Sequence, residues 1–201
     1  EPNVRATELE LYEGLEASSQ NCWPNVKFDI GGINNFISPL IPAGFYYKTF
    51  MWPKSFWKKV YEPLIRLSAG LGKSPTEPDP DIYDHKYVHY DVLVIGGGVS
   101  GIIAAKMAAK NNLKTLLVDD KKILGGSTIY QNNESIKIDD KLSSEWLKNE
   151  IQEIKKLSNL TIKTRTSIAA YHGYNFLLAK ENLTDHLPEE KKKNKIRQRL
   201  W

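Results

Sequence analysis

Short apolar runs, separated by glycines and by one helical pattern, organise the second half of the chain. Residues 92–95 form a continuous apolar run, which is typical of a parallel strand covered on both faces. Residues 101–109 then follow an alanine-rich apolar pattern that favours a buried helix, and residues 116–118 are apolar again. This order of strand, helix and strand predicts a βαβ unit over residues 90–120.

The pattern continues beyond this unit. From residue 143 or 144 to about residue 157, leucines and isoleucines recur on one face, with a serine cap at the start, so we expect a second helix. Residues 160–164 alternate between apolar and polar and predict a third parallel strand. Shorter strands are expected over residues 168–171, 174–180 and 196–201.

The first 88 residues follow a different, irregular pattern that is rich in aromatic side chains. Helices are expected over residues 4–19 and 54–67, with prolines and glycines between them, and residues 74–81 predict an extended linker. The aromatic side chains either pack against the second half of the chain or form a subunit interface. We therefore expect an irregular, partly helical extension (1–88) followed by an α/β, Rossmann-like FAD/NAD(P)-binding domain (89–201). Its parallel sheet with short antiparallel strands is expected to be truncated at the C-terminus.

The glycines between the first strand and the first helix predict a dinucleotide site. They have the spacing Gly96-x-Gly98-x-x-Gly101. The first glycine permits a tight turn, the second lets the backbone approach a pyrophosphate, and the third lets helix and strand pack closely. The pyrophosphate would lie at the helix N-terminus, where unpaired N–H groups and the helix dipole favour an anion.

An acidic residue after the second strand agrees with this prediction. Asp120 lies 19 residues after Gly101, close to the ~20 expected for an acid that binds the adenosine ribose. A carboxylate there repels a 2′-phosphate and favours NAD or FAD over NADP. Gly125-Gly126 follows, with Ser127 offering a hydroxyl. This glycine pair resembles the one found in flavoproteins that bind two dinucleotides.

Composition and charge exclude several other classes of function. The chain has 28 basic and 24 acidic residues, a net charge of +4 that is too small and dispersed to indicate nucleic-acid binding. Its single cysteine excludes a disulfide framework and indicates a reducing, cytoplasmic location. We find no membrane span, no metal-ligand spacing and no catalytic nucleophile. Because the sequence starts without Met and stops within a pattern, we expect a fragment.

Three segments carry a resemblance to a known family. They are EPNVRATELELYEGLEASSQNCWP, the long stretch that contains AGFYYKTFMWP, and DVLVIGGGVSG, in that order. Together they closely resemble the alpha subunit of heterotetrameric sarcosine oxidase, and the resemblance covers essentially the whole chain. The aromatic stretch is much more specific than the glycine motif.

The resemblance implies a multi-subunit oxidase that converts sarcosine to glycine, reduces O2 to hydrogen peroxide and passes the one-carbon unit to tetrahydrofolate or releases it as formaldehyde. It implies NAD in this chain, with FAD on the beta subunit and FMN near the interface of the two. The implied partners are the beta subunit and smaller subunits. The residues implied to contact the dinucleotide are Gly96, Gly98, Ser100, Gly101, Asp119, Asp120, Lys121, Ser127 and Ile168.

Two alternatives stay open. In one, the same site holds a working FAD in a related amine, opine or hydroxyproline dehydrogenase subunit, because NAD and FAD present the same ADP half to a glycine loop. In the other, the chain is a non-catalytic nucleotide-binding or assembly module.

Overall fold

The computed structural model describes residues 9–19, 22–40, 44, 50, 52–70, 78–130 and 136–201. Contacts divide the chain into two units, Glu1–Asp79 and Pro80–Trp201. The division lies before the boundary at residue 88 that the sequence analysis expected. The difference is a short strand, β3 (Ile82–His85), which pairs within the second unit.

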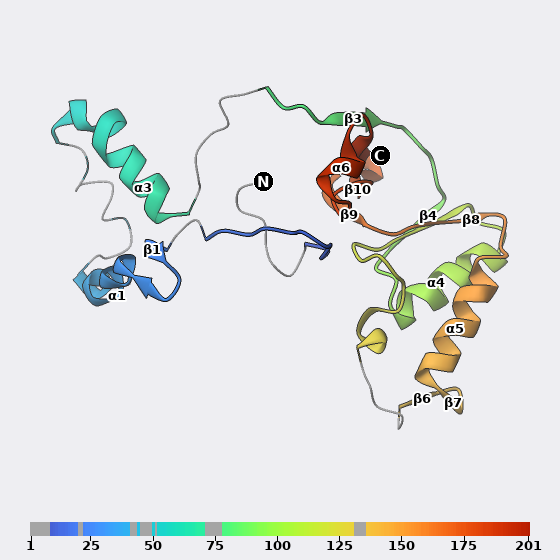
Figure 1. Ribbon diagram of the computed structural model, residues 1–201. Coiled ribbons are helices and arrows are strands. Elements are labelled where there is room, and N and C mark those ends of the chain that lie inside the picture. The colour runs from blue at the N-terminus through green and yellow to red at the C-terminus, as the bar shows by residue number, and fades with distance from the viewer. Residues whose placement is uncertain are drawn as a thin grey trace. The chain divides into compact units, whose positions relative to one another are not determined.

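The second unit contains the expected parallel sheet. Its strands β4 (Val92–Ile95), β5 (Thr115–Val118) and β8 (Leu160–Lys163) lie in the order β4-β5-β8. Helix α4 (Val99–Lys110) connects the first two strands, and α5 (Ser143–Ile154) precedes the third. Figure 1 shows both helices side by side next to the sheet. The predicted α/β fold is confirmed, with α5 ending about three residues earlier than expected.

The core of this unit lies between the helices and the sheet. Ile102, Ala105 and Ala109 are buried and fall on one face of α4, at the spacing that an amphipathic helix needs. They pack with Leu117 of β5 and Ile154 of α5. Burial of each large aliphatic side chain stabilises the fold by about 1.5–3 kcal/mol, while the alanines keep α4 close to the strands.

One lysine joins the two helices. Lys106 Nζ of α4 lies 2.7 Å from Glu150 Oε2 and 2.7 Å from Glu153 Oε2, both on α5. The hydrogen bonds to Glu150 and Glu153 raise the pKa of Lys106, and the bond to Lys106 lowers the pKa of Glu153. The ion pairs therefore add charge-dependent contacts to the apolar packing of α4 on α5.

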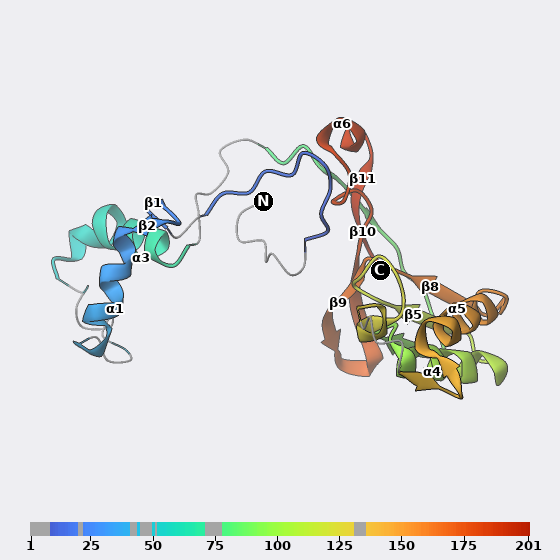
Figure 2. The same cartoon turned by 60° about the horizontal axis from the view of Figure 1, so that its bottom comes forward.

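A four-stranded sheet completes the unit, in the order β3-β11-β10-β9. Figure 2 shows β9, β10 and β11 next to the parallel sheet. Strands are present at the three later positions expected from the sequence, residues 168–171, 174–180 and 196–201, as β9, β10 and β11, but β3 was not expected. Its parallel partner β11 lies more than a hundred residues later, so no local pattern indicates it. The bounds are β9 (Thr166–His172), β10 (Phe176–Asn182), β11 (Ile196–Leu200), the short helix α6 (Glu189–Lys192) and the hairpin β6 (Lys137–Ile138) with β7 (Lys141–Leu142).

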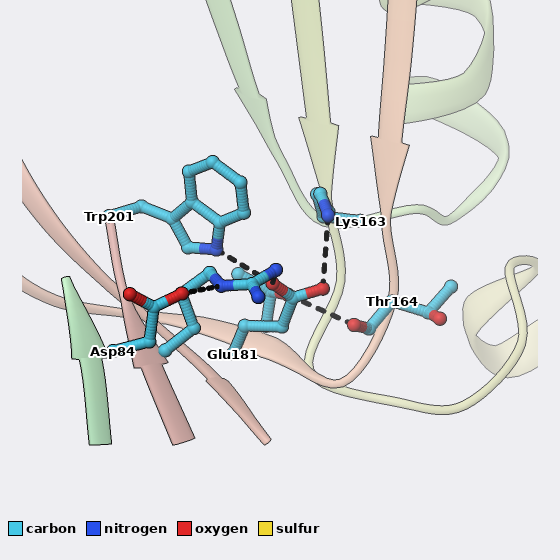
Figure 3. Close-up of polar contacts among 7 residues, drawn as sticks. Asp84, Lys163, Thr164, Glu181 and Trp201 are labelled. Carbon is cyan, nitrogen blue, oxygen red and sulfur yellow. Dashed lines mark hydrogen bonds and ion pairs between the residues drawn. The ribbon is translucent and has the colours of Figure 1, made fainter. Parts of the chain in front are cut away.

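A polar network joins the two sheets (Figure 3). Glu181 of β10 is buried, and its carboxylate accepts from Lys163 Nζ at the end of β8 (3.1 Å) and from the Trp201 indole N–H (2.8 Å). Lys163 Nζ also lies 4.6 Å from the centroid of the Trp201 ring. Nearby, Arg199 donates to Asp84 (2.7 Å) and holds the pKa of that carboxyl below its ordinary value. The network fixes the end of β8 against β10 and β11.

The first unit has short elements, and Gly70 is its one buried residue among those described. The helix expected over residues 4–19 is wrong for its described part, because residues 9–19 form no helix and Gly14, with φ +82°, lies in a turn. The helix expected over residues 54–67 is present as a 3-10 turn, a π-helical turn and α3. The bounds are β1 (Pro24–Asn25), β2 (Phe28–Asp29), α1 (Ile33–Ile37), the 3-10 turn (Lys54–Phe56), the π-helical turn (Trp57–Tyr61) and α3 (Glu62–Ser68).

The ion pairs of Lys106 predict a pH-dependent stability. The folded pKa of Glu153 is below its ordinary value of 4.5, so its contribution is present above that value and is lost as the pH falls through the folded pKa. We expect Glu153→Gln to lower the melting temperature of the full-length chain at about pH 7, and this difference to shrink as the pH falls below 4.5. A difference that is the same at both pH values would contradict the assignment.

Candidate functional site

The glycine motif forms the turn between β4 and α4, at the carboxyl edge of the parallel sheet. Gly96 follows β4 with φ +99°, and its N–H donates to the Val118 carbonyl of β5 (2.8 Å). Gly98 is the residue that precedes α4, and a Cβ built on it would have no atom within 4 Å. The start of the helix therefore faces open space at the edge where ligands of open α/β sheets bind.

Gly101 has a different role, because it sets how closely α4 approaches the turn. A Cβ at this position would lie 1.8 Å from the Gly96 carbonyl oxygen, far inside van der Waals contact. Any side chain would push the first turn of α4 away from β4. This is the close packing that the sequence analysis assigned to the third glycine.

The second glycine pair packs directly on the first loop. Gly125 N–H donates to the Gly97 carbonyl (2.7 Å). A Cβ on Gly126 would lie 3.1 Å from Gly98 Cα, and both glycines of the pair have positive φ, +132° and +55°. Other residues would be strained at these angles. The two glycine segments are separate in the sequence, but their backbones pack together and form one continuous surface beside the N-terminus of α4.

The two acids at the end of β5 have separate environments. Asp119 is buried (7% exposed), and its carboxylate accepts from the Gly97 N–H (2.6 Å) and the Lys121 N–H (2.8 Å). The Asp120 side chain is 56% exposed and pairs with Lys121 Nζ at 3.3 Å. A carboxylate has roughly four acceptor positions, so Asp119 keeps capacity for a further hydroxyl donor beside the glycine loop.

The other expected contact residues lie around this centre. Ser100 is exposed on the first turn of α4, and Ser127 is exposed in the 3-10 turn Gly126–Ile129 that follows the second glycine pair. Ile168 is half-buried in β9, opposite Ala179 of β10. The structure brings Asp119 into direct contact with the glycine loop through Gly97.

Sequence reasoning missed two contributions to the site. The motif allows any residue at Gly97. In this structure, however, a Cβ at Gly97 would lie 2.3 Å from Leu124 and 3.0 Å from the Asp119 carboxylate, so the position has little room for a side chain. The run of three glycines was the available signal. The turn after β8 was also missed: Thr166 N–H donates to the Asp119 carbonyl (2.8 Å), and Arg165 N–H donates to the Lys121 carbonyl (2.9 Å).

The chemistry of these residues suits the binding of a nucleotide. Backbone N–H groups at a helix start favour a phosphate, and the neighbouring carboxylate can accept from sugar hydroxyls. The ADP half of NAD or FAD has both groups, so the residues fit such a cofactor. Within the described ranges, no cluster of His, Cys, Asp or Glu could hold a metal ion, and no helix is long and apolar enough to cross a membrane.

Residues 91–192, which include both glycine segments and both acids, match the family described as FAD dependent oxidoreductase.

The curated relatives agree with the resemblance drawn from the sequence. The chain is 43% identical to the sarcosine oxidase subunit alpha of Rhizobium meliloti (strain 1021), over 100% of this chain and 20% of that protein. It is 31% identical to the subunit of the same name from Corynebacterium sp. (strain U-96), over 67% of this chain and 14% of that protein. The chain thus spans a fifth or less of the length of these relatives.

Among solved structures, the L-proline dehydrogenase of P. horikoshii is similar, with a TM-score of 0.42 and 20% identity, over 64% of this chain and 24% of that one.

Two glycines give a matched pair of predictions. We expect Gly101→Ala to lower the melting temperature of the full-length chain, because the new Cβ overlaps the Gly96 carbonyl and overpacking costs about 1–3 kcal/mol or more. Gly98→Ala should leave the melting temperature of the nucleotide-free chain unchanged, since its Cβ meets nothing.

Gly98→Ala should nevertheless weaken dinucleotide binding, measured by calorimetry, because the methyl group occupies the space in front of α4. Unchanged affinity in this variant would mean that no phosphate approaches Gly98.

Proposed function

The chain belongs to the FAD dependent oxidoreductases and resembles sarcosine oxidase alpha subunits over its whole length, and from this premise we propose that it is the dinucleotide-binding part of such an alpha subunit. The whole enzyme would oxidise sarcosine to glycine and reduce O2 to hydrogen peroxide. Its one-carbon product would be formaldehyde or methylene-tetrahydrofolate.

One observation carries the proposal for this chain. Two glycine segments meet at the start of α4, where Gly125 N–H donates to Gly97, and a buried carboxylate, Asp119, lies against the same loop. The space in front of Gly98 is open. A phosphate needs hydrogen-bond donors and a ribose hydroxyl needs an acceptor. The start of α4 supplies the donors, and Asp119 at the end of β5 supplies the acceptor beside the same loop.

The residues of this chain would act on the ADP half of the cofactor. Backbone N–H groups at the start of α4 would hold the pyrophosphate, and Asp119 would accept from a ribose hydroxyl while it keeps the glycine loop in place. The nicotinamide or flavin ring would supply hydride transfer, and the contacts described for this chain involve only the other half of the molecule. The proposed contact residues are Gly96, Gly98, Ser100, Gly101, Asp119, Asp120, Lys121, Ser127 and, through its backbone, Ile168.

We propose NAD as the dinucleotide in this chain, as in the family that the sequence resembles, with FAD, FMN and tetrahydrofolate bound elsewhere in the complex. FAD in this site is the second candidate, and the match to FAD dependent oxidoreductases favours it. FAD here would suit a related amine, opine or hydroxyproline dehydrogenase. The proposed partners are a beta subunit and smaller subunits in a cytoplasmic heterotetramer.

The identity of the nucleotide tests this function. The full-length subunit would be co-expressed with its partner subunits, separated and denatured, and the released nucleotide identified by chromatography and absorbance. We expect NAD, which leaves the redox chemistry to another subunit. FAD would move a redox centre into this chain, and a subunit without nucleotide would contradict the proposal.

The two neighbouring acids can be told apart by substitution. We expect Asp119→Asn to weaken dinucleotide binding by about 1–3 kcal/mol. The asparagine amide has one acceptor oxygen, so its NH2 group faces either the Gly97 N–H or the ribose hydroxyl, and one of these two hydrogen bonds is lost. Asp120→Asn, at an exposed carboxylate, serves as the matched control and should have the smaller effect. Calorimetric titrations in which Asp120→Asn has the larger effect would assign the ribose to Asp120.

A further inference from the structure

The hairpin of β9 and β10 ends in a group of exposed aromatic side chains. We define the aromatic tip as residues 171–176, the end of the β9 strand, a 3-10 turn and the start of β10. Tyr171 is 68% exposed, Phe176 is 51% exposed, and Tyr174 is fully exposed. The hairpin belongs to the four-stranded sheet, whose strands β9, β10 and β11 Figure 2 shows beside the parallel sheet.

The aromatic tip is held in a fixed shape by contacts within itself. Tyr171 Oη donates to Asn175 Oδ1 (2.7 Å), and the rings of His172 and Phe176 lie 5.7 Å apart. The strands pair up to the turn, with Phe176 opposite His172. Rings presented in a preformed arrangement lose little conformational freedom on binding, which favours association.

Two features of Tyr174 do not favour folding of this chain. Its φ is +61°, in the left-handed region, where glycine or asparagine is the usual residue. Of the seven non-glycine residues with positive φ in the described part of the chain, five are Asn or Asp. Its ring is fully exposed and gains nothing from burial. Packing among the described residues therefore gives no reason for tyrosine at this position, and strained residues of this kind cluster at functional sites.

The charge pattern indicates what the aromatic tip contacts. Residues 166–179 contain no Asp, Glu, Lys or Arg, although 26% of the chain is charged. A surface without cations is unsuited to a nucleic-acid backbone or an acidic membrane, both of which need Lys or Arg. Exposed aromatic residues without charged neighbours are the composition of the centre of a protein–protein interface.

We propose that the aromatic tip docks on a partner subunit, at an uncharged, apolar surface with a hydrogen-bond acceptor for the Tyr174 hydroxyl. The inference rests on the proposed function for the existence of a partner chain. Tyr174 is the central residue: its ring projects from the turn and would be buried on assembly, where tyrosine is among the residues that contribute most to binding.

The test compares two tyrosines in the full-length subunit, assembled with its partner subunits. Tyr174→Asn keeps the backbone angle and removes the ring. Tyr87→Asn is the matched control, because Tyr87 is 86% exposed and lies outside the hairpin. We expect Tyr174→Asn to weaken assembly at least about tenfold, as a central interface residue does, with a melting temperature of the separated subunit that is unchanged or higher. The control should assemble normally.

Hydrogen exchange gives a second readout. Because the ladder of β9 and β10 already protects some amides of residues 171–176, the readout is the change on assembly, and these amides should exchange more slowly in the complex than in the separated full-length subunit. Equal exchange in the two states would overturn the inference, as would normal assembly of Tyr174→Asn. The nucleotide content of the same samples separates the two proposals, because loss of assembly with Tyr174→Asn supports the docking surface whichever nucleotide is found.

Discussion

The hydrogen bond from the Gly97 N–H to the buried Asp119 carboxylate is the contact on which the rest of the site depends. It fixes the glycine loop to the end of β5, and the Lys121 N–H fixes the other carboxylate oxygen to the chain that follows. A buried carboxylate needs such donors, because leaving a buried charged acceptor without partners costs several kcal/mol. With both partners in place, the loop is set before any ligand arrives, and preorganisation lowers the cost of binding.

The packing around this bond explains why so many glycines occur here. Four of them have no room for a side chain: a Cβ would meet Leu124 at Gly97, the Gly96 carbonyl at Gly101, Leu147 and Ile129 at Gly125, and the Gly98 backbone at Gly126. Gly96 and Gly98 have free space at their Cβ positions, but Gly96 has a φ of +99°, which favours glycine. The close contacts hold the loop after β4 and the Gly125-Gly126 pair together. The open space at Gly98 leaves the backbone of the loop accessible to a ligand. The polar network of Glu181 then holds the end of β8, and with it the turn whose Thr166 N–H reaches the Asp119 carbonyl.

The sequence predicted the elements whose signals are local. The apolar runs of β4 and β5, the alanine-rich face of α4 and the glycine spacing each lie within a short window, so the βαβ unit and its loop were expected correctly. The pairing of β3 with β11 joins residues more than a hundred positions apart, and a local hydrophobic pattern cannot predict such a pairing. The spacing after Gly101 indicated Asp120 as the ribose acid, because a count of about 20 residues does not distinguish two adjacent acids. Only the direction of the chain after β5 buries Asp119 and exposes Asp120. The helix expected over residues 4–19 failed in its described part at Gly14, where the chain turns with φ +82°.

In the proposed function, the loop between β4 and α4 holds the ADP half of a dinucleotide. We would therefore titrate ADP itself into the nucleotide-free full-length subunit, because ADP is common to NAD and FAD and needs no partner subunit or substrate. We expect one ADP bound per chain, with added protection of the Gly96–Gly101 amides from hydrogen exchange. Absence of binding, or binding without added protection at these amides, would contradict it.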